Sequence, residues 1–177
     1  MQNLNTYKNF YFVGIGGIGM SALARYFHAA GKNVLGYDKT ETKLTTALIS
    51  EGIDIVFEDV INEKIKELNK EETLVIYTPA IKILGILDYF NINNFTVLKR
   101  AKVLGLITEN TECIAVAGTH GKTTTSSLVA HLCKVANLPF SGFLGGISEN
   151  YKSNFIYNGT EMSVLEADEY DRSFLNL

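Results

Sequence analysis

Short apolar runs alternate with longer amphipathic stretches along most of this chain, and that alternation restricts its fold more than any other feature. The apolar runs have the length of buried strands, and the stretches between them carry charged residues at helical spacing. Strands that alternate with helices pair in parallel, because each helix crosses back over the sheet. The pattern therefore predicts an α/β protein built on a parallel sheet.

The same pattern predicts the order of the elements and two domains. Strands are expected at residues 10–13, 34–37, 53–57, 73–77, 95–97, 113–117 and 163–165. Helices are expected at about 20–30, 42–50, 60–68, 99–106 and 122–135. A polar stretch near 108–112 suits a linker, so we predict a first domain at 1–108 and a second at 109–177. Because the chain stops six residues after the acidic cluster that ends at Asp171, the second domain is expected to be incomplete.

Composition excludes several classes of function. The 177 residues are 46% apolar and 20% charged, as in ordinary soluble domains. The net charge is −3 and the lysines are scattered, which argues against nucleic-acid binding. No apolar run is long enough to cross a membrane, and the first residues do not resemble a signal peptide. Cys113 and Cys133 lack metal-ligand spacing, so both are expected to be buried free thiols in a cytoplasmic protein.

A glycine-containing loop follows the strand expected at 113–117 and opens a helix. It consists of Gly118, Thr119, His120, Gly121, Lys122, Thr123 and Thr124. The glycines permit a tight path, Lys122 can reach the β and γ phosphates of a nucleoside triphosphate, and Thr123 can place its hydroxyl on Mg²⁺. Val116 stands where the usual pattern has its first glycine, so the loop is a shortened variant. It predicts a site for ATP and Mg²⁺.

An acidic residue supports the same interpretation. Glu166 directly follows the strand expected at 163–165, and ligands of parallel sheets lie at the carboxyl ends of strands. A carboxylate there can hold Mg²⁺, which prefers oxygen ligands. The neighbouring Asp168, Glu169 and Asp171 also fit a solvated acidic turn.

A second glycine-rich turn lies near the amino terminus, between a strand and a helix. Its residues are Gly14, Ile15, Gly16, Gly17, Ile18 and Gly19. Asp38 ends the second strand, where an acid that binds ribose belongs. This spacing predicts a pyrophosphate on the helix amino terminus, and both NAD and a UDP-sugar carry that group. Arg100 suits an anionic ligand, although a solvated arginine at a helix end fits equally well.

Two such turns in succession, with these strings, resemble the Mur ligase family of peptidoglycan synthesis. The resemblance rests on residues 14–24, 117–125, 143–147 and 165–174. It implies a Rossmann-like parallel-sheet domain for UDP, followed by the start of a P-loop-type central ATPase domain. A third domain would lie outside this chain. The strings are most similar to those of the member that joins L-alanine to UDP-N-acetylmuramate.

The resemblance also implies a role for each matching residue. Lys122 and Glu166 would be catalytic, and Thr123 and Glu166 would hold Mg²⁺. The residues expected to bind the UDP-sugar are Gly14, Gly16, Gly17, Ile18, Gly19, Asp38, Thr78 and Arg100. ATP would phosphorylate the muramate carboxylate, and the alanine amine would then displace phosphate from the acyl phosphate.

Three other interpretations stay open at this point. The chain could be a module that binds UDP-N-acetylmuramate without turnover, or belong to the related ligase that recycles murein tripeptide. It could also be an NAD-dependent oxidoreductase that uses the first glycine turn. The last interpretation ranks lowest, because it leaves the loop around Lys122 unexplained.

Overall fold

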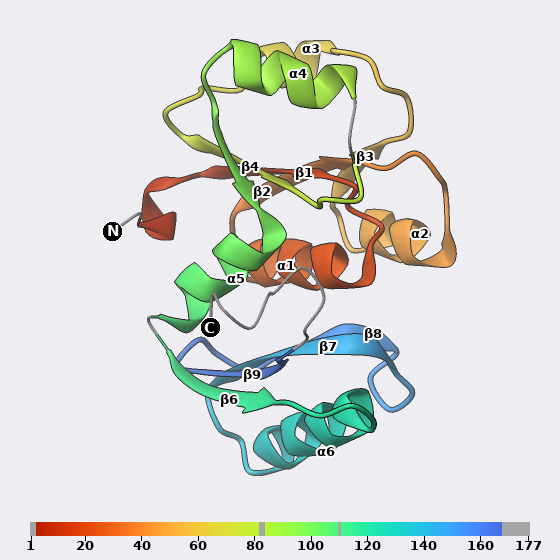
Figure 1. The fold of residues 1–177 in the computed structure, drawn as a ribbon, viewed down its shortest axis with the longest axis vertical. Helices are drawn as coiled ribbons and strands as arrows, with labels where there is room; N and C mark the ends of the chain where they lie inside the picture. Colours follow the sequence, from red (N-terminus) through yellow and green to blue (C-terminus); the bar gives the residue numbers. More distant parts are fainter. Residues whose placement is uncertain (1–2, 82–83, 110, 168–177) are drawn as a thin grey trace. The chain divides into compact units, whose positions relative to one another are not determined.

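The structure is a computed structural model that describes residues 3–81, 84–109 and 111–167 (Figure 1). The chain divides into two compact units, Met1–Val103 (unit 1) and Leu104–Leu177 (unit 2). The division falls inside helix α5 (Arg100–Thr108), a few residues before the domain boundary expected from the polar stretch. Each unit has its own sheet, and each is described by itself.

Unit 1 is a parallel α/β domain, as the sequence predicts. Its strands are β1 (Asn9–Val13), β2 (Asn33–Tyr37), β3 (Asp54–Val56), β4 (Thr73–Tyr77) and β5 (Thr96–Lys99). They pair in the order β3-β2-β1-β4-β5, and every pair is parallel. The helices are a 3-10 turn η1 (Leu4–Thr6), α1 (Ile18–Ala29), α2 (Lys43–Ser50), α3 (Glu63–Lys66) and α4 (Gly85–Ile92), followed by α5.

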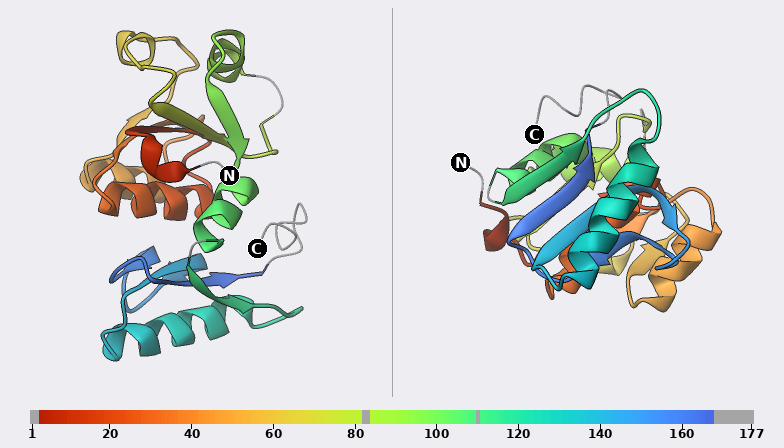
Figure 2. Two further views of the ribbon diagram at one scale, coloured as in Figure 1. Left: turned by 90° about the vertical axis from the view of Figure 1, so that its left-hand side faces the viewer. Right: turned by 90° about the horizontal axis from the view of Figure 1, so that it is seen from below.

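Successive side chains of β1 point to opposite faces of this sheet, and helices cover both faces. Figures 1 and 2 show α1 and α2 on one face and α3 and α4 on the other. Toward α1, Phe10 stacks on Phe27 with ring centroids 3.8 Å apart. Toward α4, Tyr11 packs against Phe90 at 4.8 Å. Burial on both faces explains why the strand sequences are almost continuously apolar.

Unit 2 has a mixed sheet covered on one face by a single long helix. Its elements are β6 (Glu112–Val116), α6 (Lys122–Val135), β7 (Phe140–Ser148), β8 (Ser153–Tyr157) and β9 (Met162–Glu166). The strand order is β6-β9-β7-β8, with β8 antiparallel to β7 and the other pairs parallel. Figure 2 shows α6 lying across this sheet. Ala130 and Cys133 of α6 pack on Phe140, Ile156 and Val164.

The structure differs from the sequence predictions in several elements. The helix expected at 60–68 is one turn, α3, and the helix α4 was not predicted. The hairpin of β7 and β8 was also missed. Cys133 is buried as expected, but Cys113 is exposed, so its prediction was wrong. The reason is that Cys113 lies on β6, an outer strand whose side chains remain open to solvent in the described residues.

The helices of the described residues are all too short or too polar to cross a bilayer.

Candidate functional site

The first part of the candidate site lies where the chain connections of unit 1 change direction. β1 lies between β2 and β4 in the sheet, so the connections that leave β1 and β4 run to opposite sides. In such sheets a crevice opens at the carboxyl ends of the two central strands. The predicted glycine turn starts there, directly after Val13. Gly14 has φ 85°, a value that favours glycine, and its N–H donates to the Tyr37 carbonyl at 2.8 Å.

Asp38 braces this turn from the end of β2. Its Oδ2 atom accepts a hydrogen bond from the Gly16 N–H at 2.7 Å, and its Oδ1 atom accepts one from the Thr40 N–H at 3.1 Å. A Cβ on Gly16 would lie 2.8 Å from Oδ2, so only glycine allows this contact. Because Asp38 occupies the Gly16 N–H, an anion at this turn would meet the first-turn N–H groups of α1 instead.

The same turn brings together two other predicted residues. A Cβ on Gly14 would lie 3.2 Å from the Cγ2 atom of Thr78, which follows β4. A Cβ on Gly19 would lie 3.1 Å from both Cδ and Nη1 of Arg100, at the start of α5. Gly17 is the N-cap of α1, and Ile18 is its first residue. The predicted UDP-sugar residues are therefore neighbours in space, and a guanidinium lies over the positive end of a helix.

The second part of the candidate site joins β6 to α6 in unit 2. Gly118 and Gly121 have φ values of 148° and 77°, and Gly121 is the N-cap of α6. The Lys122 ammonium folds back and donates to the Gly118 carbonyl at 2.8 Å. Thr119 and His120 are exposed in the loop. Thr124 is exposed on the first turn of the helix, so the loop is open to a large ligand.

Strand pairing places Glu166 next to this loop. β6 and β9 are parallel neighbours with Val116 opposite Glu166, so the carboxylate stands at the strand end from which the loop departs. The Thr123 hydroxyl donates to Glu166 Oε2 at 3.2 Å. Thr123 and Glu166, predicted from separate segments, are therefore in direct contact. The acidic residues Asp168, Glu169 and Asp171 lie outside the described residues.

These side chains fit a nucleotide-bound Mg²⁺ ion. A hydroxyl and one carboxylate are hard oxygen donors, and Mg²⁺ is usually held by one or two carboxylates together with substrate phosphates and water. Within the described ranges, no three His, Cys, Asp or Glu residues gather as in an all-protein metal cage. The contact between the Thr123 hydroxyl and the Glu166 carboxylate suits an ion whose other ligands are phosphate oxygens and water.

Sequence reasoning missed two residues that contact Glu166. The Ser126 hydroxyl, one turn after Thr123, donates to Oε1 at 3.1 Å, and the Gly145 N–H of β7 donates to the same oxygen at 2.8 Å. The spacing of three between Thr123 and Ser126 was a readable signal, because such residues share a helix face. The pair Gly145 and Gly146 inside an apolar strand was another, since glycine there marks a close approach.

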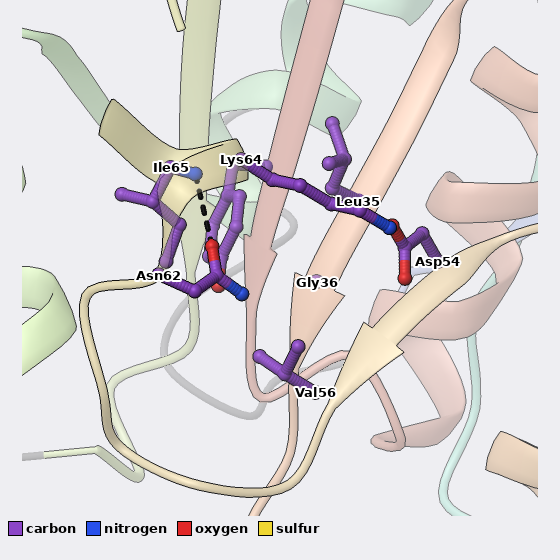
Figure 3. A pocket seen from close by; sticks show the side chains of 8 residues that line it. Leu35, Gly36, Asp54, Val56, Asn62, Lys64 and Ile65 are labelled. Carbon is purple, nitrogen blue, oxygen red and sulfur yellow. Dashed lines mark hydrogen bonds and ion pairs between the residues drawn. The ribbon is translucent and has the colours of Figure 1, made fainter. Parts of the chain in front are cut away.

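Two cavities in unit 1 contain none of the predicted site residues. A small one of about 10 Å³ lies beside β2, with Leu35 and Ile65 in its wall (Figure 3). Tyr11 also lines it. There Lys64 pairs with Asp54, and Asn62 Oδ1 accepts from the Ile65 N–H at 3.0 Å. The other, about 390 Å³ and open, follows β3 around Phe57 and Val60.

Comparison with known proteins shows the family of this chain. The family model described as Mur ligase family, catalytic domain, matches residues 9–111, more than half of the chain. The UDP-N-acetylmuramate–L-alanine ligase of Flavobacterium psychrophilum is 56% identical over 177 residues, which is 99% of this chain and 40% of that protein. The chain thus spans about 40% of the length of such curated relatives.

Solved structures give the same picture of the fold. The crystal structure of UDP-N-acetylmuramate-alanine ligase from Thermotoga maritima has a TM-score of 0.78 and 34% identity, covering 91% of this chain and 37% of that one. A Neisseria structure named UDP-N-acetylmuramate:L-alanyl-gamma-D-glutamyl-meso-diaminopimelate ligase also has a TM-score of 0.78, with 26% identity over 94% of this chain and 54% of that one. Both the family model and these likenesses place the chain in one group: it belongs to the Mur ligase family.

Proposed function

We propose that this chain supplies the UDP-sugar site and part of the ATP site of a ligase that joins L-alanine to UDP-N-acetylmuramate. The observation that carries the proposal is the contact between Thr123 and Glu166 at 3.2 Å, directly after a loop that contains Lys122. A hydroxyl, a carboxylate and an ammonium together match the needs of a Mg²⁺-bound triphosphate. The name and identity of the Flavobacterium relative favour L-alanine as the amino acid.

In this proposal the two units prepare two reactants. Unit 1 holds the UDP pyrophosphate at the amino terminus of α1, with Arg100 as the cation and Thr78 beside it, while Asp38 keeps the turn in shape. In unit 2, Lys122 offsets charge on the transferred phosphoryl group, and Thr123 and Glu166 hold Mg²⁺. Mg²⁺ would draw electron density from the phosphate oxygens.

The reaction follows from what each group can do. The muramate carboxylate attacks the γ phosphorus of ATP, and the bond to the bridging oxygen breaks, so that ADP departs with its electron pair. The acyl phosphate that forms has a good leaving group. The neutral amine of L-alanine then attacks the acyl carbon, phosphate departs with the bonding electron pair, and the nitrogen releases one proton to solvent to give the amide. Holding the carboxylate in line with the phosphate is the contribution expected of the UDP-sugar site.

The recycling ligase for murein tripeptide is the second candidate. Its support is the likeness to the Neisseria structure at 26% identity, compared with 34% for the alanine ligase of Thermotoga. A competition assay separates the two: full-length protein is offered L-alanine and the tripeptide at equal concentration. Formation of the alanyl product alone supports the first proposal, and formation of the tripeptide product supports the second.

Calorimetric titration tests the UDP-sugar site. The 177-residue chain should bind UDP-N-acetylmuramate and should not bind NAD. Binding of NAD without any response to the UDP-sugar would overturn the proposal. With ATP, UDP-N-acetylmuramate and L-alanine all present, we expect no phosphate release from this chain alone and robust release from the full-length protein.

A single substitution tests the ATP loop. Lys122→Ala in the full-length protein should abolish phosphate release, because the β and γ phosphates lose their cation, while binding of UDP-N-acetylmuramate stays nearly unchanged. Lys152→Ala is the matched control, since Lys152 is an exposed lysine of the same unit that pairs with Glu149. If Lys122→Ala lost both phosphate release and binding of UDP-N-acetylmuramate, the lysine would instead have a structural role.

A further inference from the structure

Glu166 accepts three hydrogen bonds, which are divided unequally between its two carboxylate oxygens. Oε1 accepts two of them, from the Ser126 hydroxyl at 3.1 Å and from the Gly145 N–H at 2.8 Å. Oε2 accepts the Thr123 hydroxyl at 3.2 Å. The donors come from α6 and β7, and Glu166 ends β9, so elements on both sides of the carboxylate fix its rotation.

The surroundings leave little freedom for another rotation. Ser126 is fully buried, and its single proton is shared between Glu166 and the Thr123 carbonyl, also at 3.1 Å. A Cβ on residue 145 would lie 2.5 Å from Glu166 Oε2, so a side chain at this position would collide with the carboxylate. A Cβ on Gly146 would lie 3.2 Å from the Thr123 methyl group. The two glycines therefore leave room for Glu166 and Thr123.

We propose that Ser126 and the Gly145 N–H are positioning groups that tie up Oε1, so that Glu166 offers only Oε2 to a divalent cation and the site prefers Mg²⁺ to Ca²⁺. The inference rests on the proposed function, because it takes Thr123 and Glu166 as the Mg²⁺ residues. The Thr123 hydroxyl can keep donating to Oε2 while its lone pairs face the ion.

One-oxygen ligation discriminates between the two ions. Mg²⁺ requires near-octahedral geometry with short bonds to single oxygens, whereas Ca²⁺ takes more ligands and often binds both oxygens of a carboxylate. A carboxylate whose Oε1 is held by two protein donors cannot turn both oxygens toward an ion without breaking those bonds. Ser126→Ala removes one of them, so that only the Gly145 N–H holds Oε1 and the carboxylate turns more easily.

The test measures the metal itself. Binding of Mn²⁺ to the full-length protein with a non-hydrolysable ATP analogue is followed by electron paramagnetic resonance, and Mg²⁺ and Ca²⁺ are titrated in as competitors. Ser126→Ala should weaken Mg²⁺ binding about tenfold, as is typical when a partner of a metal ligand is lost. It should also narrow the preference for Mg²⁺ over Ca²⁺. Ser126→Thr keeps a hydroxyl and should keep both properties.

Controls separate failure of this inference from failure of the proposed function. Ser127→Ala, the neighbouring serine, should behave like the unchanged protein. Glu166→Gln should abolish tight Mn²⁺ binding, and if it does not, the proposed metal site is wrong and the inference falls with it. If Glu166→Gln does abolish binding but Ser126→Ala changes neither Mg²⁺ affinity nor the ion preference, only the inference is overturned. An equal loss of Mg²⁺ affinity in Ser126→Ala and Ser126→Thr would also overturn the inference, because the packing of residue 126 rather than its hydroxyl would then matter.

Discussion

Tyr11 carries a buried hydroxyl that has no hydrogen-bond partner among the described residues. The residue is 2% exposed and lines the small cavity beside β2. Burial raises the pKa of Tyr11 above its ordinary value of 10, and the charges of Asp54 and Asp59 raise it further. An orphaned polar group of this kind opposes folding, because it gives up water without gaining a partner.

Tyr11→Phe is therefore expected to increase the free energy of unfolding by about 1 kcal/mol, since it removes only the orphaned oxygen. The change also affects the pH dependence. Above about pH 10 the unfolded chain loses the tyrosine proton while the folded chain keeps it, so stability falls as pH rises, and Tyr11→Phe should reduce that fall. Urea unfolding at pH 8 and pH 10.5 measures both effects. Tyr157→Phe, at a 40% exposed position, is the control.

Arg100 offers a second prediction for a single residue. Its guanidinium approaches Gly19 at the amino terminus of α1. Arg100→Ala should weaken binding of UDP-N-acetylmuramate by about 2 kcal/mol, the size of a hydrogen bond to a charged group. The neighbouring exposed Lys99 provides the control Lys99→Ala. Calorimetry that finds equal affinity in both variants would remove Arg100 from the proposed site.

Among the elements, α4 depends on a residue far away in the chain. Its N-cap, Leu84, has no side chain able to cap the helix, and the carboxylate of Asp59 instead accepts the N–H groups of Gly85 and Ile86, both at 2.8 Å. Asp59→Ala should lower the free energy of unfolding by about 1 kcal/mol, the usual cost of losing a cap. Urea unfolding should find almost no effect for Glu58→Ala.

This distant cap also explains which elements the sequence predicted. The strands and helices beside the two glycine turns follow from local patterns, and they were predicted well. Helix α4 was missed because its capping carboxylate lies 26 residues before Gly85. Strand β7 was missed because Gly142, Gly145 and Gly146 lower its strand propensity, although their lack of a side chain lets α6 and Glu166 come close.

The residues of the candidate site also fall into two groups, those that a local pattern predicts and those that depend on strand pairing. Motif spacing picked out Lys122 and Thr123, and the end of an expected strand picked out Glu166, because these residue types follow from phosphate and Mg²⁺ chemistry. The contacts of Glu166 with Ser126 and Gly145 depend on the pairing of β9 with β6 and β7, which no local pattern encodes. Asp38 was predicted as a ribose contact, and the structure adds its bond to the Gly16 N–H.

At the scale of the whole molecule, each unit has a hydrophobic core cluster of its own among the described residues. Phe90 belongs to the core of unit 1 and Val164 to that of unit 2, and both are fully buried. Val164→Ala should destabilise unit 2 by about 2 kcal/mol through the cavity it leaves. Hydrogen exchange should then accelerate in β7 and β9 and stay unchanged in β1 and β4. Acceleration in all four strands would mean that the units unfold together.

The position of β6 has a consequence for the handling of this chain. Among the described residues β6 has one neighbour, β9, so the backbone groups along its other side have no strand to pair with. Its sequence Glu-Cys-Ile-Ala-Val carries a single charge, and Ile114 is 39% exposed. An edge strand of this kind can pair through its backbone with a second chain, and charges and prolines on edge strands usually prevent such pairing. An apparent molar mass from light scattering that rises with protein concentration is the expected sign, and dilute samples will suit the binding experiments best.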